Sequence, residues 1–246
     1  MRRVRAPGVR TARGAWIVAR PGATRPGRER LVFLAGFALY FGLLWYLWWS
    51  PVLYPLKVFV VFLHEISHGI ASVATGGSID RITLSPLLGG ACFCPGGNAF
   101  LTLSSGYLGS LAWGALMIEG ARWSGRRPAR MLRVFGFLVS VLTLLYVRGF
   151  FGITFGLLFG FALVFCAARL STQLNRTLLT VLGLTSCLYA LLDIKGDILD
   201  RPELRSDAFV LSEMTGVPTL VWGALWIVAA LAVSGWLLAR AYRAKV

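Results

Sequence analysis

The stretch LKVFVVFLHEISHGIASVA, residues 56–74, is an apolar segment with the two histidines of the chain near its centre. On a helix, the four-residue spacing of His64 and His68 places both imidazoles on one face, one turn apart, where they can bind the same metal ion. Glu65 lies about 100° further round the helix and can reach a water on that metal without binding the metal itself. The stretch therefore predicts a helix with a zinc site, in which Glu65 takes the proton as water attacks an amide carbonyl.

Such a motif also occurs by chance, and a lone histidine in an apolar helix is more often a packed core residue. Here chance would have to bury two imidazoles and a carboxylate at metal-binding spacing. Ionisable groups are rare in apolar segments of membrane length, and they usually mark a functional site. We therefore favour the metal site.

The composition is that of a polytopic membrane protein. Hydrophobic residues make up 57% of the chain and aromatic residues 13%, and the mean hydropathy is +0.71, outside the range of soluble domains. The net charge of +15 could suggest a nucleic-acid partner. However, the basic residues lie mainly in the N-terminal tail and in short links. These positions are typical of residues that set membrane topology and contact lipid headgroups. We expect the lipid bilayer as a partner and no nucleic acid.

Two parts of different character follow from the charge pattern. Residues 1–30 hold nine arginines and one glutamate among small residues and prolines, which predicts a basic, mobile cytoplasmic tail. Residues 31–246 form the predicted transmembrane domain. The apolar run 131–168 would be a helix of about 57 Å, far longer than a bilayer core of roughly 30 Å, so we expect it to fold back at Arg148 and Gly149.

The predicted fold is an all-α bundle of six or seven transmembrane helices. Seven spans result if residues 56–74 cross the membrane, and six result if that segment is re-entrant. The distribution of Arg and Lys among the links favours six spans. The predicted apolar runs are 31–49, 56–74, 99–118, the two halves of 131–168, 177–192 and 217–239. In the run 99–118, four small residues give a face for close helix packing: Gly106, Gly109, Ser110 and Gly114.

Residues 75–98, TGGSIDRITLSPLLGGACFCPGGN, hold six glycines and two prolines around a short alternating piece. This pattern predicts a bent hairpin beside the metal, whose strand edges could hold an extended substrate. An ordinary connecting loop is the alternative. Cys92 and Cys94 are too few for a four-cysteine metal site, and Cys166 and Cys187 lie in apolar runs as small hydrophobic residues.

A zinc ion held by two histidines needs a third protein ligand, with the fourth position left to water. The chain has no third histidine, so a carboxylate must supply it. The segment LLDIKGDILDRPELRSDAFVLSEMTG, residues 191–216, offers Asp193 and Asp197 at the end of an apolar run. Asp200 and Asp207 are weaker candidates, and the alternative for each aspartate is a solvated helix end.

Several blocks together resemble the site-2 protease family of intramembrane zinc metallopeptidases, in particular its compact bacterial branch. They are HEISHG, TGGSIDRITLSPLLGG, SGYLGSLAWG, LLDIKGD and SDAFVLSEMTGVPTLVWGALW. The resemblance implies a protease that cuts membrane-embedded or membrane-tethered protein substrates, with His64 and His68 as Zn²⁺ ligands and Glu65 as catalytic base. The third ligand of the family is a distal aspartate in a Leu-Asp-Gly context. Here the match is Leu192, Asp193 and Ile194, which lacks the glycine, so Asp193 and Asp197 both remain candidates.

The resemblance also implies a multi-pass protein of the bacterial inner membrane, with the seven-span arrangement and a metal site facing the cytoplasm. A rival function is a metal-binding membrane protein without turnover, either a transporter or an inactive protease-like scaffold. Glu65 favours the enzyme, because a pure binding site needs no base at that position.

Overall fold

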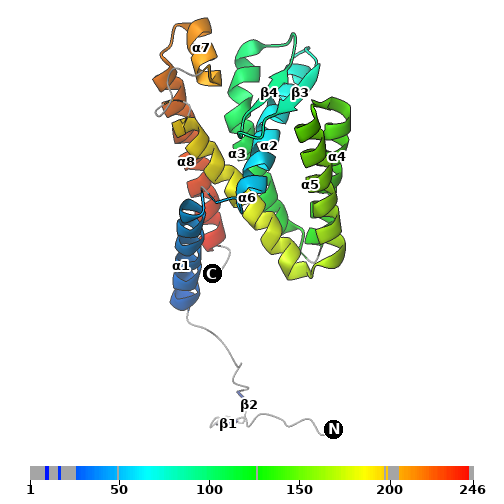
Figure 1. The fold of residues 1–246 in the computed structure, drawn as a ribbon. Helices are drawn as coiled ribbons and strands as arrows, with labels where there is room; N and C mark the ends of the chain where they lie inside the picture. Colours follow the sequence, from blue (N-terminus) through cyan, green and yellow to red (C-terminus); the bar gives the residue numbers. More distant parts are fainter. Residues whose placement is uncertain are drawn as a thin grey trace.

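The computed structural model describes residues 9–10, 16–17, 26–48, 50–125, 127–196, 198 and 205–243. In these residues the chain is mostly helical, with one three-stranded sheet and one pair of very short strands (Figure 1). The all-α fold with a single glycine-rich hairpin is confirmed. The helices are α1 (Pro26–Tyr46), α2 (Tyr54–Ala74), α3 (Ala99–Trp123), α4 (Pro128–Tyr146), α5 (Phe150–Arg169), α6 (Thr172–Lys195), α7 (Asp207–Thr215) and α8 (Thr219–Arg243). The strands are β1 (Val9–Arg10), β2 (Trp16–Ile17), β3 (Arg81–Leu84), β4 (Gly90–Phe93) and β5 (Val147–Arg148).

Six of these helices are long and apolar enough to cross a membrane: α2, α3, α4, α5, α6 and α8. The most apolar window of α2 is 72% buried, against 22–56% for the other five. The helix with the HEISHG motif is therefore the central one, surrounded by protein. The predicted run 31–49 lies mainly on α1, so both counts of spans stay open, and the orientation stays a prediction.

Most of the predicted basic tail lies outside the described residues. Within it, β1 and β2 pair antiparallel, with Val9 opposite Ile17. Helix α1 begins at Pro26, five residues before the expected start of the transmembrane domain. Proline is well suited to a first helical turn, because its missing N–H would have no partner inside the helix there.

The long apolar run folds back where expected. Helix α4 ends at Tyr146, α5 begins at Phe150, and Gly149 between them has a φ of 91°, which a residue without Cβ adopts at little cost. The two residues before this glycine form β5, which pairs parallel to β3. The turn between α4 and α5 is thereby tied to the hairpin beside the metal motif.

Residues 75–98 form the predicted hairpin. Strands β3 and β4 pair antiparallel with Ile82 opposite Cys92, and the order of the sheet is β4-β3-β5. The central strand is anchored by the fully buried Ile82, and the tip of the hairpin is held by Tyr54, whose hydroxyl donates to the Pro86 carbonyl (2.8 Å). Because β4 is an outer strand in this order, one of its edges is not paired with another strand of this sheet.

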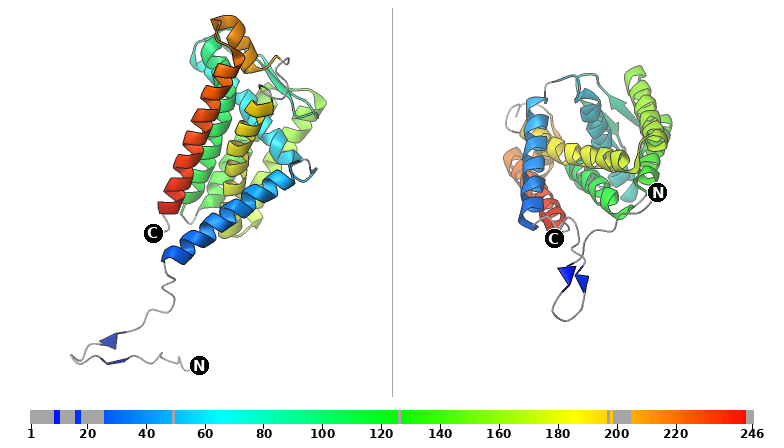
Figure 2. Two further views of the ribbon diagram at one scale, coloured as in Figure 1. Left: turned by 90° about the vertical axis from the view of Figure 1, so that its left-hand side faces the viewer. Right: turned by 90° about the horizontal axis from the view of Figure 1, so that it is seen from below.

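Small residues allow the helices to approach closely, as the sequence predicts for α3. A Cβ at Gly114 would lie 2.7 Å from the Gly183 carbonyl of α6. In the same way, a Cβ at Gly160 of α5 would lie 2.8 Å from the Gly136 carbonyl of α4. Figure 2 shows α3, α6 and α8 running alongside one another. Contacts of this kind supply dispersion attraction where lipid makes the hydrophobic effect weak.

Helix α8 is also fixed by charge. Glu119 of α3 is 4% exposed, and its carboxylate forms ion pairs with Arg122 (3.2 Å) on its own helix and with Arg240 (3.4 Å) of α8. A buried carboxylate is costly unless such partners neutralise it. The ion pair between Glu119 and Arg240 therefore joins α3 to α8, the helix that follows α7.

We expect Gly160→Leu to lower the free energy of unfolding by about 1–3 kcal/mol, because overpacking forces α4 and α5 apart. The matched control is Gly235→Leu on α8, where a Cβ meets no atom within 4 Å. Thermal unfolding of the purified protein in detergent measures both. Equal unfolding temperatures for the two variants would contradict the role given to the glycine contact.

Candidate metal centre

The motif lies in the middle of α2, which begins at Tyr54, has Pro55 in its first turn, and ends where the backbone N–H of Thr75 bonds back to the last turn. Between these ends, an uninterrupted helix aligns His64 and His68 one turn apart, with ring centroids 4.7 Å apart. Glu65 and His68 are each 6% exposed. The predicted side chains of His64, Glu65 and His68 therefore lie on the most buried of the candidate membrane-spanning helices.

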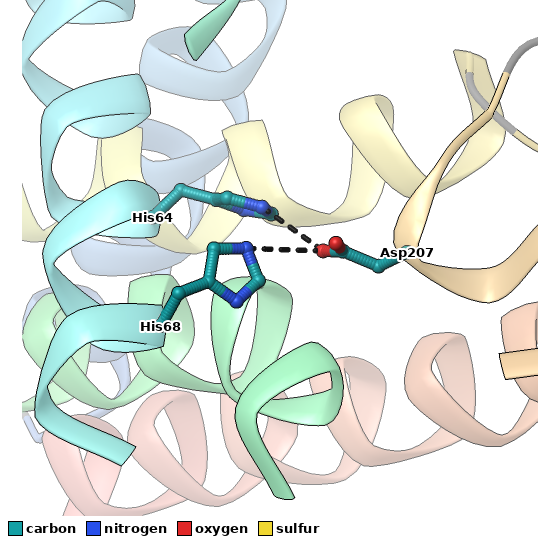
Figure 3. Close-up of side chains that lie close together, drawn as sticks. All are labelled: His64, His68 and Asp207. Atoms are coloured by element: carbon teal, nitrogen blue, oxygen red, sulfur yellow. Dashed lines mark hydrogen bonds and ion pairs between the residues drawn. The ribbon is translucent and has the colours of Figure 1, made fainter. Parts of the chain in front are cut away.

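Asp207, the first residue of α7, meets both histidines (Figure 3). Its Oδ2 atom lies 3.1 Å from His64 Nε2 and 3.3 Å from His68 Nε2. The start of α7 is set locally, because the Ser206 side chain accepts a hydrogen bond from the Phe209 N–H as its N-cap. This cap directs the next side chain, Asp207, toward α2.

The three side chains fit a zinc ion. One atom from each of His64, His68 and Asp207 lies within 4.8 Å of the others. Tetrahedral zinc with bonds of about 2.0–2.1 Å separates its ligand atoms by roughly 3.3–3.4 Å. The observed separations between Asp207 Oδ2 and the two Nε2 atoms, 3.1 and 3.3 Å, are close to this value. Two nitrogen ligands and one carboxylate oxygen also form a donor set that zinc commonly takes at catalytic sites.

The imidazole of His68 is already oriented for a metal. Its Nδ1–H donates to the Thr102 carbonyl of α3 at 2.7 Å, which fixes the tautomer and leaves the lone pair of Nε2 directed at the site. The ring of His64 packs edge-on against Tyr107, with centroids 4.8 Å apart. Gly106 lies directly beneath both rings, since a Cβ there would overlap His64 Nε2 and come within 2.6 Å of His68 Cε1.

Asp207 is ionised at neutral pH. Burial by itself raises the pKa of this carboxyl, but His68 and His64 outweigh burial and hold the pKa well below its usual range. The negative charge is the form that binds a cation.

Glu65 is held toward the hairpin. The backbone N–H of Cys92 in β4 donates to its carboxylate, and a Cβ at Gly90 would lie 2.6 Å from Glu65 Oε1. The register explains both contacts. The Ser85 N–H bonds to the Gly89 carbonyl, so with the two-residue alternation of an antiparallel ladder, Gly90 and Cys92 direct their backbone groups away from β3. These backbone groups face α2.

These groups line a cavity of about 690 Å³. Its walls are the HEISH turn of α2, the glycine-rich edge of β4, the first turns of α3, and Arg205 to Met214 around α7. The three possible metal ligands and Glu65 thus share one space, large enough for several residues of an extended peptide.

The structure brings Asp207, and not Asp193, into the group of three possible metal ligands among the described residues. Asp193, near the end of α6, lines the same cavity but does not belong to the group of three possible ligands. Asp197 and Asp200 lie outside the described residues. The position of the LLDIKGD block at the end of an apolar run favours Asp193 and Asp197, yet the chain returns to the histidines only after α6 has ended. The sequence signal at Asp207 is the Ser206–Asp207 pair, which predicts a helix start. It does not predict which part of the chain Asp207 contacts.

The two hairpin cysteines have no place among the possible metal ligands of the described residues. Cys92 and Cys94 are joined by a disulfide with a Cα–Cα distance of 5.5 Å, and both line the cavity. Cys187 is buried, in agreement with its predicted role as a small hydrophobic residue, and Cys166 is partly buried.

Comparison with known proteins gives one match. A family model described as peptidase M50B-like matches residues 37–237, a range that spans α2 to α7 and includes all three ligand candidates. Neither a search of curated proteins nor one of solved structures finds a match. The resemblance to the site-2 protease family is therefore confirmed at the level of the family.

We expect Asp207→Ala to weaken zinc binding by at least about 100-fold, since changes around metal ligands alone cost 10–100-fold. Asp193→Ala is the matched control, because it removes a carboxylate from the same cavity and should leave zinc binding nearly unchanged. Zinc per protein, measured by mass spectrometry of metals after dialysis against a graded chelator, separates them. Loss of zinc in Asp193→Ala with retention in Asp207→Ala would return the third position to Asp193.

We also expect Gly106→Ala to abolish stoichiometric zinc binding, because the new methyl group would occupy the space of the imidazole nitrogen of His64. Gly235→Ala, at a position with open space around it, controls for the change of residue type. The same zinc measurement applies, with circular dichroism to show that both variants keep their helices. Full zinc occupancy in Gly106→Ala would show that α3 does not pack against the imidazoles as described.

Proposed function

Because the chain belongs to the peptidase M50B-like family, we propose that it is an intramembrane zinc metalloprotease that hydrolyses peptide bonds of membrane-embedded or membrane-tethered proteins. The observation that carries this proposal is the meeting of His64, His68 and Asp207 beside Glu65 in one cavity. The six helices of membrane-spanning length agree with a multi-pass protein, and we propose the bacterial inner membrane as its location.

His64, His68 and Asp207 are the residues that would hold zinc. A zinc ion bound there supplies Lewis acidity, which polarises a carbonyl group and acidifies water at neutral pH. With three protein ligands, one coordination position stays open, as catalytic sites require.

Glu65 performs the proton transfers. Its carboxylate accepts a proton from the attacking water and then delivers it to the nitrogen of the leaving amine. The Cys92 N–H bond holds this carboxylate in place before substrate arrives, and burial of the side chain excludes competing solvent. Such preorganisation matters because a base acts only within hydrogen-bond reach of the proton that it removes.

The edge of β4 suits an extended substrate. A peptide that adds to this edge would bond to the backbone groups of Gly90 and to the Cys92 carbonyl, which do not pair with β3. Glu65 lies beside the same two residues, so the bound peptide would pass the catalytic base. A membrane helix has all its backbone groups paired internally. The substrate must therefore unwind locally, and the strand edge offers replacement hydrogen bonds.

We expect Glu65→Gln to lower the rate of proteolysis roughly a hundredfold to ten-thousandfold, the usual contribution of a general base, while zinc stays bound. The assay uses purified full-length protein in detergent with an unstructured protein such as casein, read by gel and mass spectrometry. Glu213→Gln is the matched control, because this exposed glutamate of α7 pairs with Arg205 at 2.9 Å and does not line the cavity.

This test distinguishes a protease from a metal-binding scaffold without turnover. Unchanged cleavage in Glu65→Gln would contradict the enzyme mechanism. Stoichiometric zinc without cleavage by the wild-type protein, toward casein or toward peptides in reconstituted bilayers, would favour the metal-binding scaffold instead.

A further inference from the structure

One face of α4 combines two arginines with an apolar strip. Arg130 and Arg133 are followed on the same face by Val134, Phe137, Leu138 and Val141, at the helical spacing i, i+3, i+4, i+7. Together these six residues line a surface groove of about 550 Å³. The groove lies toward the start of α4, away from the metal centre, because α4 runs from this end toward β5 and the hairpin.

The described residues leave part of the apolar strip uncovered. Val134 is 60% exposed and Phe137 is 69% exposed, on a helix that is long and apolar enough to cross a membrane. Figure 1 shows α4 at the side of the bundle, with α5 as its neighbour. In a bilayer, acyl chains cover such a strip at no cost.

The two arginines lack acidic partners among the described residues. Arg122 and Arg205 form ion pairs with glutamates, but neither Arg130 nor Arg133 forms one with any described acidic side chain. Arg133 donates a long hydrogen bond from Nε to the Ala129 carbonyl, 3.4 Å, and α4 contains no acidic residue. Two guanidinium groups one turn apart therefore present a local charge of about +2.

We propose that this face is a binding site for one anionic phospholipid. The phosphate lies between the guanidinium groups of Arg130 and Arg133, where paired N–H donors match its oxygens. One acyl chain lies along Val134, Phe137, Leu138 and Val141.

The dimensions agree with this assignment. Seven residues separate Val134 from Val141, which is about 10 Å of helix. One leaflet contributes half of a hydrocarbon core of roughly 30 Å, or about 15 Å. The apolar strip thus fits within the depth of one leaflet when the arginines lie at the level of the headgroup. A free phosphate ion would use the arginines alone and leave the apolar strip unexplained.

The site selects anionic lipids over zwitterionic ones. A zwitterionic headgroup carries an ammonium group beside its phosphate, and the two arginines repel this ammonium group. An anionic headgroup such as phosphatidylglycerol keeps its charge uncompensated. Attraction of about 1 kcal/mol per basic residue near an anionic surface predicts that loss of both arginines weakens binding about thirtyfold.

The test measures binding of phosphatidylglycerol and of phosphatidylcholine with the same acyl chains to delipidated full-length protein, by native mass spectrometry from detergent. Arg130→Gln/Arg133→Gln should weaken phosphatidylglycerol binding about thirtyfold, and Phe137→Ala should weaken both lipids severalfold. Arg169→Gln is the matched control, because Arg169 ends α5 at the same edge of the bundle but does not line the groove. Soluble glycerol phosphate should not displace the lipid.

Equal binding of the two lipids by the wild-type protein would overturn the proposal. Unchanged binding by the double variant would overturn it too, as would equal loss in Arg169→Gln, which would show only a general attraction to the basic surface. Because binding is read without proteolysis, and because the groove shares no residue with the metal centre, the outcome is independent of the proposed enzymatic function.

Discussion

Asp207 lies against two imidazoles in the interior of a membrane protein, and the rest of the structure depends on that contact. A carboxylate removed from water is costly unless partners stabilise its charge. Here both partners come from α2, more than 130 residues earlier in the chain, and their Nε2 atoms lie 3.1 and 3.3 Å from the same oxygen. The contact brings distant parts of the chain to one cavity, and it gives the two imidazoles of α2 a common partner.

Two glycines make room for this arrangement. The absence of a side chain at Gly106 lets α3 approach α2 until its backbone touches the imidazoles, and the absence of one at Gly90 lets β4 approach Glu65. Close approach also brings hydrogen-bond partners into range: the Thr102 carbonyl orients His68, and the Cys92 N–H holds Glu65. The small residues of α3 and of the hairpin therefore shape the site directly, beyond their role in helix packing.

The sequence predicts what short-range chemistry determines. The helical spacing of His64 and His68, the turn at Gly149 and the hairpin 75–98 each follow from residues close together in the chain, and the structure contains all three. The choice among four aspartates is different in kind. Asp193 and Asp207 are both near helix ends, and their local patterns say nothing about which end faces α2. That choice depends on how α6, α7 and α8 pack, which is a property of long-range contacts.

Helix α7 shows why the position of the third possible ligand depends on tertiary packing. A helix of nine residues is too short to be stable alone in water, so its position follows from what it buries. Ala208 and Leu211 are fully buried in a cluster with Tyr107 of α3 and Trp226 of α8. Tyr107 in turn packs against His64. The same packing that fixes α7 therefore touches the first histidine, and a metal that binds all three side chains can bind only when α7 is docked. Metal binding and the docking of α7 are thus thermodynamically linked, since a ligand stabilises the state that it binds. Of the three possible ligand positions, two lie on one helix, and the third comes near them only in the folded bundle.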